Sequence, residues 1–522
     1  MWLERIKHQT LDKIKKREIL ILILCLITGF ALRFYTFDQK SLWMDEIYTF
    51  YDSRDDIKGQ IKFYKSDPTY LHPPLFFILT HSFYPFTKPE RDLRIIPLIF
   101  GTLSIPMLYL LARQFTSSIA LPCTLSLTFM VYHISLSQDG RSYSMIMFLG
   151  MVGLYFFIKY LKTSKRRYLP LTAFFFSLLF YTSYSSIPFI TLSQILWFYK
   201  PGEEVRKPKL SPFLVLNGLI LLFCLPWVLF ILFNYKGQSL MHPLHKEAPE
   251  SFMDILYNLF HDWVPYPPLM IISSIFLILL PFFSKNKKNA FIFLILLLLP
   301  IGGLTLFCQL FNFTHFITSR YFINFLPIFF ISIYLSITQI EVNFGGLKRI
   351  LRIGLLFILL LIASNLIILP LYYRFEKEDK RGLVNYLKNQ IREGDKIIVS
   401  SVSDIPGILY YFGIHPPGRH HVIPVTKEIK EYKISFIYQN ALFTIYRPMT
   451  CCEQYMNDNG RIWVVVRKWA AKKFKEESVL ALKGYFDGSF LNYIRFPVDA
   501  SIYLFLWDPS SPNEKGIDMP IE

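Results

Sequence analysis

Cysteine is scarce in this chain, with six residues among 522. Four of them stand inside apolar runs: Cys25, Cys123, Cys224 and Cys308. A thiol in such a run behaves as a small hydrophobic side chain. The other two, Cys451 and Cys452, are adjacent and could form a vicinal disulfide or pair elsewhere, but they lack the spacing of a metal site. Neither a disulfide framework nor a structural zinc site is therefore indicated.

Acidic residues are also few, with 38 Asp and Glu against 56 Lys and Arg, which gives a net charge of +18. Residues 372–522 hold 21 basic and 18 acidic residues, so nearly all of the excess lies in residues 1–371. There the basic residues form short clusters between apolar runs, as in the cytoplasmic loops of membrane proteins. The positive charge is thus a topology signal, and we expect no nucleic-acid partner.

What the chain has in abundance is apolar sequence, with 53% hydrophobic residues, 51 Phe, 32 Tyr and a mean hydropathy of +0.35. This profile is typical of a polytopic membrane protein. The basic N-terminus precedes an apolar run without a small-residue cleavage site, which predicts an uncleaved first span and a cytoplasmic start. We predict eleven spans, at about 19–37, 93–113, 117–136, 142–160, 168–183, 185–199, 210–233, 267–284, 289–309, 320–339 and 350–371. With these spans, the basic clusters near Lys162, Lys200, Lys285 and Lys348 all fall inside.

The segment that begins with His72-Pro73-Pro74 is the main ambiguity in this topology. Its apolar run ends near Phe86 and has only about 14 residues, which is short for a span and typical of a re-entrant segment. If it crossed, every later loop would change sides and the basic clusters would face outward, so we favour the re-entrant reading. The large outward loops are then 38–92 and 234–266, the second with an amphipathic stretch at 252–263.

After residue 371 the composition becomes that of a soluble domain. Helical spacing is visible over 380–392, and strands are expected at 396–400, 434–438, 442–446, 462–466 and 502–507. The expected fold is a polytopic α-helical membrane domain (1–371) with about eleven transmembrane helices and re-entrant or juxtamembrane helices, followed by a soluble α/β domain (372–522). By the span count, the second domain is extracytoplasmic and the protein is a multi-pass protein of the cell membrane.

Asp45 and Glu46 follow the first span directly, at the membrane–water boundary, where a carboxylate can stay ionised and still face a lipid-borne substrate. Other ionisable residues stand at the outer ends of predicted spans: Arg94, Asp139, Arg141 and Arg320. Such groups are costly near lipid and indicate function. The alternative is that Asp139 and Arg141 pair at a helix start and that Arg320 extends to the interface.

His72 has two readings of equal standing. The prolines after it suit the first turn of a helix, which makes the segment a rigid helix start. Alternatively, His72 donates a hydrogen bond to a phosphate at that helix N-terminus. Transfer of a group from a lipid phosphate would use both residue types seen here, because a carboxylate deprotonates the acceptor and arginines stabilise the phosphate leaving group.

The motif Ser41-Leu42-Trp43-Met44-Asp45-Glu46 resembles the first-loop signature of GT-C-fold glycosyltransferases, in the branch with protein O-mannosyltransferases and aminoarabinose transferases. The similarity continues through further segments, the last two of them in the tail: His72–Leu75, the span from Arg94 to Arg113, Ser137–Tyr143, Ser319–Pro327, Gly394–Val399 and Leu409–Tyr411. It implies inverting sugar transfer from a polyprenyl-phosphate donor, with Asp45 as general base, Glu46 positioning Asp45 or the acceptor, and Asp139 as a second acid. The donor-binding residues that it implies are His72, Arg94, Arg141, Tyr143, Arg320 and Tyr321.

Cofactor and acceptor stay open at this stage. Asp45, Glu46 and Asp139 could hold a divalent metal through oxygen ligands, although the basic residues nearby favour a metal-independent reaction. A protein, a glycan and a glycolipid are all compatible acceptors, and His72-Pro73-Pro74, in place of a lysine-containing segment, argues against assuming lipid A. Two other functions remain as alternatives, a flippase for lipid-linked sugars, which the absence of a hydropathy repeat disfavours, and a non-catalytic relative.

Overall fold

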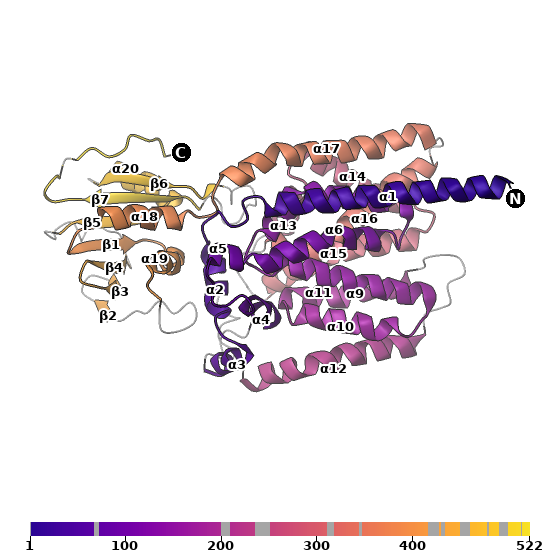
Figure 1. Cartoon of the computed structure of the whole chain (residues 1–522), viewed down its shortest axis with the longest axis horizontal. Helices are drawn as coiled ribbons and strands as arrows, with labels where there is room; N and C mark the ends of the chain where they lie inside the picture. The colour runs from indigo at the N-terminus through magenta and orange to yellow at the C-terminus, as the bar shows by residue number, and fades with distance from the viewer. Residues whose placement is uncertain are drawn as a thin grey trace. The chain divides into compact units, whose positions relative to one another are not determined.

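The computed structural model divides into two compact units (Figure 1). It describes residues 2–66, 72–199, 209–234, 251–310, 318–343, 347–415, 427–429, 434–448, 460–477, 480–489, 500–512 and 514–521. The helical unit comprises Met1–Phe37, Asp56–Ser82 and Arg94–Pro370. The sheet unit comprises Asp38–Asp55, Phe83–Leu93 and Leu371–Glu522. Two pieces of the predicted loop 38–92 therefore pack with the C-terminal sheet, whereas the sequence analysis placed the whole loop with the membrane domain.

The helical unit is built from apolar helices and short connecting turns. Its elements are α1 (Trp2–Phe34), α3 (Ile57–Ser66), α4 (Leu75–His81), α6 (Ile95–Ala112), η1 (Ser117–Ile119), α7 (Ala120–Phe129), α8 (Val131–Ser137), α9 (Tyr143–Thr163), α10 (Tyr168–Phe180), η2 (Tyr184–Ser186), α11 (Ile187–Leu192), η3 (Ser193–Phe198), α12 (Leu210–Asn234), α13 (Phe252–Trp263), α14 (Pro267–Phe283), α15 (Lys287–Leu310), η4 (Ser319–Phe325), α16 (Leu326–Asn343) and most of α17 (Leu347–Arg374).

Six helices in the described part of the chain are long and apolar enough to span a membrane, or up to eight if each of two bent helix pairs is one span. Multiple spans are thus confirmed, but the count of eleven is not. Predicted span 185–199 is a succession of short turns and helices, because Ser183 caps the turn at Ser185 and Pro188 starts a new helix. Segment 72–86 contains only the seven-residue α4, about 10 Å long and too short to cross a bilayer alone.

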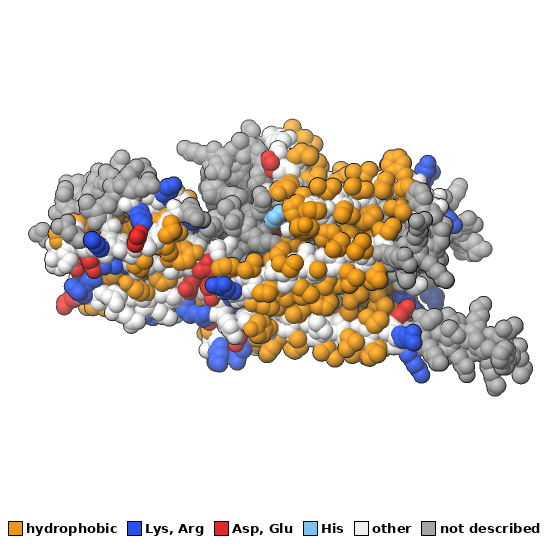
Figure 2. All heavy atoms as spheres, turned by 90° about the horizontal axis from the view of Figure 1, so that it is seen from above, with side chains coloured by type: hydrophobic (Ala, Val, Ile, Leu, Met, Phe, Trp, Pro, Cys, Tyr) orange, Lys and Arg blue, Asp and Glu red, His pale blue; other side chains and the backbone are white. Residues whose placement is uncertain are grey.

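The helices of this unit differ in how much lipid-type surface they present. Only 17% of the apolar window of α12 is buried, whereas 78% of that of α9 is buried. On α12, Leu232 and Phe233 are 70% and 83% exposed. Figure 2 shows hydrophobic side chains covering much of the helical unit on the face drawn there. Since water would disfavour so much apolar surface, this unit is suited to a membrane.

The sheet unit contains one mixed sheet in the order β2-β3-β4-β1-β5-β7-β6. Strand β1 is parallel to β4 and β5, and the outer pairs are antiparallel. The strands are β1 (Asp395–Val399), β2 (Lys427–Ile429), β3 (Ile434–Gln439), β4 (Phe443–Pro448), β5 (Ile462–Arg467), β6 (Ala481–Phe486) and β7 (Ile502–Trp507). The helices are α2 (Met44–Asp52), α5 (Pro89–Asp92), α18 (Lys380–Gln390), η5 (Val402–Asp404), α19 (Ile405–Phe412) and α20 (Lys468–Glu477).

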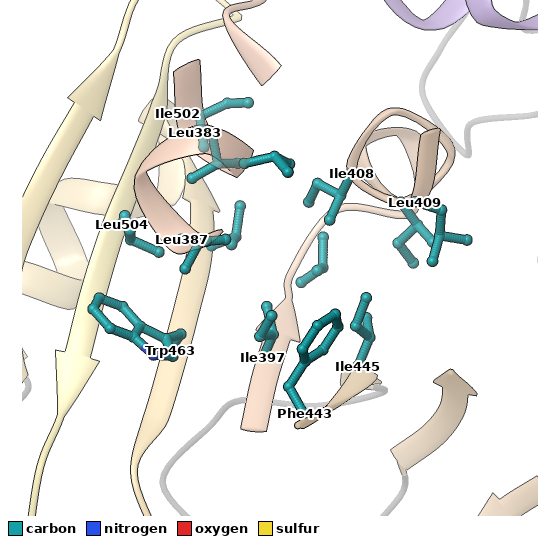
Figure 3. Close-up of a cluster of buried hydrophobic side chains, with 14 of the residues drawn as sticks. Leu383, Leu387, Ile397, Ile408, Leu409, Phe443, Ile445, Trp463, Ile502 and Leu504 are labelled. Atoms are coloured by element: carbon teal, nitrogen blue, oxygen red, sulfur yellow. The ribbon is translucent and has the colours of Figure 1, made fainter. Parts of the chain in front are cut away.

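Apolar side chains are buried on both faces of this sheet. Along β1, Ile397 and Val399 join the core under α18 and α19, drawn in Figure 3, while Ile398 joins a second core with residues of α20. Burial on both faces gives the continuous apolar runs from which the five strands were predicted. All five are confirmed; β2 and β6 were not predicted. Cys451 and Cys452 lie outside the described residues, and Cys25, Cys123, Cys224 and Cys308 are buried free thiols, as expected.

Candidate active site

Asp45 and Glu46 lie in the first turn of α2, where the helix dipole favours negative charge. Glu46 is fully buried, and its Oε2 accepts a hydrogen bond of 3.4 Å from the backbone N–H of Trp43, the residue before the helix. Asp45 is half-buried, and its carbonyl oxygen accepts a hydrogen bond of 3.1 Å from Thr49 Oγ1. Glu46 therefore fixes the start of the helix that carries Asp45.

Arg94 precedes α6 in the helical unit and is 1% exposed. Its Nη1 donates to the carbonyl oxygen of Phe37 at 2.9 Å. Gln138 makes similar contacts a few residues earlier in the chain. Its side-chain amide donates to the carbonyl oxygens of Arg33 at 2.8 Å and Tyr35 at 2.6 Å. Arg94 and Gln138 thus hold the C-terminal end of α1 and the residues after it, immediately before the segment that leads to Asp45.

Asp139 and Arg141 form a tight turn between α8 and α9. The backbone N–H of Arg141 donates to the carbonyl oxygen of Asp139 at 2.6 Å. Asp139 is 3% exposed and Arg141 is half-buried. Ser144, in the first turn of α9, donates to the carbonyl oxygen of Pro97 at 2.8 Å and so ties this turn to the start of α6.

Arg320 and Tyr143 are brought together within the helical unit. The guanidinium carbon of Arg320 lies 5.3 Å from the centroid of the Tyr143 ring, a cation–π contact between η4 and α9. Arg320 Nε donates to Thr318 Oγ1 at 3.4 Å. Arg320 is 7% exposed, Tyr143 is 9% exposed and the neighbouring Tyr321 is half-buried.

His72 is half-buried before α4, and its ring centroid lies 6.2 Å from that of Phe77. The helix start is held by the backbone N–H of Leu75, which donates to the carbonyl oxygen of Tyr181 at 3.0 Å. Pro74 occupies the cap position. The segment is therefore a helix start, as both readings of His72 require.

Asp262 is a buried acid that the sequence analysis did not single out. It is 2% exposed in the last turn of α13, and its Oδ2 accepts a hydrogen bond of 2.5 Å from Ser319 Oγ. Ser319 directly precedes Arg320, so Asp262 lies next to a predicted donor-binding residue. The available signal was an acid and a histidine inside the apolar run Leu259–Val264.

A hollow of about 220 Å³ in the helical unit lies away from these residues. Its lining includes Phe115, after the end of α6, and Gln339, near the end of α16. Arg94 and Arg320 precede the starts of the same two helices, each of 18 residues and about 27 Å long. The hollow therefore belongs to the opposite end of the helices from the candidate residues.

The candidate residues are divided between the two units. Asp45 and Glu46 belong to the sheet unit, and the others belong to the helical unit: His72, Arg94, Asp139, Arg141, Tyr143, Arg320 and Tyr321. Among the residues that the structure describes, no group of three or more His, Cys, Asp or Glu could hold a metal ion.

Residues 71–230 match the model of a family described as dolichyl-phosphate-mannose-protein mannosyltransferase. Among solved structures, the chain is similar to ArnT from Cupriavidus metallidurans in the apo state, with a TM-score of 0.51 and 9% identity over 95% of this chain and 99% of that one. For ArnT bound to undecaprenyl phosphate, the TM-score is 0.46, with 9% identity over 94% and 98%. An Archaeoglobus fulgidus oligosaccharyltransferase gives 0.43, with 11% identity over 74% and 61%. No curated protein matches the chain.

The fold assignment rests on the apo ArnT structure, whose TM-score is above 0.5. The match covers nearly the whole of both chains, so it includes the helical unit and the sheet unit. The matched family segment contains five of the candidate residues: His72, Arg94, Asp139, Arg141 and Tyr143. These findings confirm the resemblance to GT-C glycosyltransferases that the sequence motifs indicated.

Proposed function

Since the chain has the GT-C fold of membrane glycosyltransferases, we propose that it transfers a sugar from a polyprenyl-phosphate donor to an acceptor on the outer face of the membrane, with inversion. The acceptor is a glycan, a glycolipid or a protein. The observation that carries this proposal is the position of Asp45, half-buried in the first turn of α2, the helix that follows α1 along a chain with this fold.

In this proposal Asp45 is the general base. Its carboxylate removes the proton from the acceptor hydroxyl or amine as the acceptor attacks the anomeric carbon, and the bond to the donor phosphate breaks. Glu46 holds the helix start on which Asp45 stands, through its contact with the Trp43 amide. Asp139 is a second acid of the reaction.

The departing polyprenyl phosphate needs cations, and guanidinium groups match phosphate oxygens with two parallel hydrogen bonds. We assign this role to Arg94, Arg141 and Arg320, with His72, Tyr143 and Tyr321 contacting the phosphate or the sugar. The stacking of Arg320 on Tyr143 supports the assignment, because it holds the guanidinium in one orientation. No metal ion is required by these roles, and the metal dependence of the reaction is decided by adding a chelator to the assay.

The proposed topology has a cytoplasmic N-terminus, with the catalytic residues and the sheet unit outside. It is supported by the basic clusters between spans, which collect on the inner side in this arrangement. Labelling of single cysteines introduced at exposed positions Asp38 and Lys165 with an impermeant reagent in whole cells tests it, since only the first should react.

The central test is transfer from a radiolabelled polyprenyl-phosphate sugar by the purified chain in detergent, with an envelope extract as the source of acceptor. We expect Asp45→Asn to lower the transfer rate by about 10²- to 10⁴-fold, the usual contribution of a general base. The matched control is Asp38→Asn, an exposed acid of the same loop, which should transfer at the normal rate. A near-normal rate for Asp45→Asn would reject Asp45 as the base.

The detergent assay also separates this function from that of a flippase. Transfer needs no sealed compartment, whereas transport of a lipid-linked sugar can be observed only across one. If the intact chain transfers nothing in detergent but moves the labelled lipid across sealed vesicles, the glycosyltransferase proposal is wrong.

A further inference from the structure

The segment that leads into α2 is held by side chains through its backbone. All four backbone N–H groups from Ser41 to Met44 donate to side-chain oxygens. Three of the acceptors belong to the C-terminal part of the sheet unit, and the pairs are Ser41 with Glu376 at 3.1 Å, Leu42 with Tyr411 at 2.6 Å and Met44 with Glu378 at 3.2 Å. The fourth pair is Trp43 with Glu46. The path of this segment is therefore set by groups more than 300 positions away in the sequence.

Tyr411 is the centre of one part of this arrangement. Its hydroxyl accepts hydrogen bonds from Leu42 N at 2.6 Å and from Ser41 Oγ at 3.3 Å, and it donates to Glu90 Oε1 at 3.1 Å. Burial and the carboxylate of Glu90 raise the pKa of Tyr411, so the hydroxyl keeps its proton at neutral pH. One hydroxyl thus joins α19 to both pieces of the first loop found in this unit.

Glu378 is the centre of the other part. One of its oxygens, Oε2, accepts from Met44 N, and the other, Oε1, accepts from Arg467 Nη2 at 2.9 Å. Lys380 also contacts Glu378, and Arg467 Nε donates to Asp404 Oδ2 at 2.7 Å. Burial opposes the charge of Glu378, but Lys380 and Arg467 outweigh it and lower the pKa of Glu378. An ionised oxygen is therefore directed at the first helical N–H of α2, one residue before Asp45.

Helix α19 also packs closely on α2. Leu42, Ile47 and Leu93 are fully buried and form an apolar cluster together with Tyr410 and Tyr411. A Cβ added at Gly407 would overlap Lys380 Cδ and lie 3.2 Å from Ile47 Cδ1, so glycine leaves room here for Lys380 and for the approach of α2. The hydrogen bonds to the segment are thus made across a packed surface.

We propose that Tyr411 and Glu378 are positioning residues for Asp45, which they act on by fixing the backbone that enters α2. This inference rests on the proposed role of Asp45 as the base. A general base has to lie within hydrogen-bond reach of the proton that it removes, and a displacement of about 1 Å can cost about 10²-fold in rate. The C-terminal part of the sheet unit is accordingly a component of the catalytic apparatus.

The test compares Tyr411→Phe with Tyr410→Phe, its neighbour on α19, whose ring packs against Phe50 at 5.0 Å. Each variant loses one hydroxyl and keeps its ring in the apolar cluster. For the folded, monodisperse full-length protein, we expect Tyr411→Phe to lower the maximal transfer rate 10- to 100-fold with little change in the donor KM. Tyr410→Phe should match the unaltered chain in both quantities.

A double-mutant cycle with Asp45→Glu identifies the route of the effect. If Tyr411 acts through the carboxylate at position 45, its substitution should cost much less in a chain whose carboxylate is already displaced by one methylene. Additive losses, or a normal rate for Tyr411→Phe, would overturn the inference. If Tyr411→Phe does not fold, Glu90→Ala replaces it, since it removes the oxygen to which the Tyr411 hydroxyl donates, and a normal rate for it would likewise overturn the inference.

The failure of this inference can be told apart from that of the proposed function. An active Asp45→Asn protein refutes the base and leaves nothing for Tyr411 to position. An inactive Asp45→Asn protein with a fully active Tyr411→Phe protein keeps the base and refutes the positioning role.

Discussion

Arg33, a buried cation of the helical unit, donates to main-chain carbonyls, whereas Arg467, a buried cation of the sheet unit, binds two carboxylates. Arg33 is fully buried, and its Nη2 donates to the carbonyl of Leu127 at 2.9 Å, next to the bend between α7 and α8. In the sheet unit, Arg467 binds Asp404 and Glu378. A helix interrupted in lipid must have its free carbonyls satisfied by the protein itself, which a cation can do without a buried anion. An ion cluster, by contrast, depends on every member.

The largest expected effect is on the ion cluster. Arg467→Ala leaves Glu378 and Asp404 as buried carboxylates with less compensation, and we expect a loss of about 3–5 kcal/mol in the free energy of unfolding. The loss is measured by denaturant unfolding of the full chain in detergent, with the protease sensitivity of the sheet unit as the signal. Lys472→Ala on the exposed side of α20 is the control, and an equal effect of both variants would remove the contrast between the units.

The next effect concerns the carbonyls near the bend. Arg33→Leu should cost about 1–3 kcal/mol, because it leaves the buried carbonyls of Leu127 and Thr128 without this donor. The measurement is the thermal unfolding midpoint in detergent, with Arg17→Leu, an exposed residue of the same helix, as the control. A loss of stability as large as that of Arg467→Ala would mean that the carbonyl-bound arginine and the ion cluster stabilise their units equally.

Substitution of Arg94 tests whether an arginine that donates to a main-chain carbonyl also binds the sugar donor. We expect Arg94→Ala to raise the donor KM about 10-fold, which corresponds to about 1.4 kcal/mol. Arg113→Ala, an exposed residue after the other end of α6, should leave the KM unchanged. A lower unfolding midpoint with an unchanged KM would place Arg94 in the same purely structural class as Arg33.

The smallest effect is a dependence of stability on pH that comes from Glu378 in the ion cluster. Because the pKa of Glu378 is lowered in the folded state, its contribution is present above the ordinary glutamate value of 4.5 and is lost as the pH falls through the folded value. The denaturant concentration at the unfolding midpoint of the sheet unit should therefore fall as the pH is lowered below 4.5. Glu378→Gln should flatten this part of the profile, and an unchanged slope would contradict the assignment to Glu378.

Local patterns predicted the central strands and the apolar helices, since both arise from side chains close in sequence. Strand β6 was missed because Lys483 and Gly484 interrupt its apolar run, and only its pairing with β7 reveals it. Helix α2 escaped notice for a similar reason, because its nine residues follow no long periodic pattern.

The candidate acid Asp45 was visible through its motif, but the groups that hold its helix were not. Tyr411 belongs to the segment Leu409–Tyr411, which carried part of the resemblance but indicated no role for it, and Glu376 and Glu378 stood in no motif. The role of all three follows from contacts across more than 300 positions. Asp262 was missed because a single acid in an amphipathic stretch is usually a solvated one; its burial against Ser319 depends on the packing of α13 on η4.

The membership of Asp38–Asp55 and Phe83–Leu93 in the sheet unit has a practical consequence for protein engineering. A truncation after Pro370 would remove Glu376, Glu378 and Tyr411, which accept hydrogen bonds from the backbone of Ser41–Met44. An inactive truncated protein would therefore give no information about acceptor choice. A chimaera intended to change the acceptor range should instead take all three segments of the sheet unit, Asp38–Asp55, Phe83–Leu93 and Leu371–Glu522, from one parent protein. The C-terminal tail then keeps the loop pieces that it packs against.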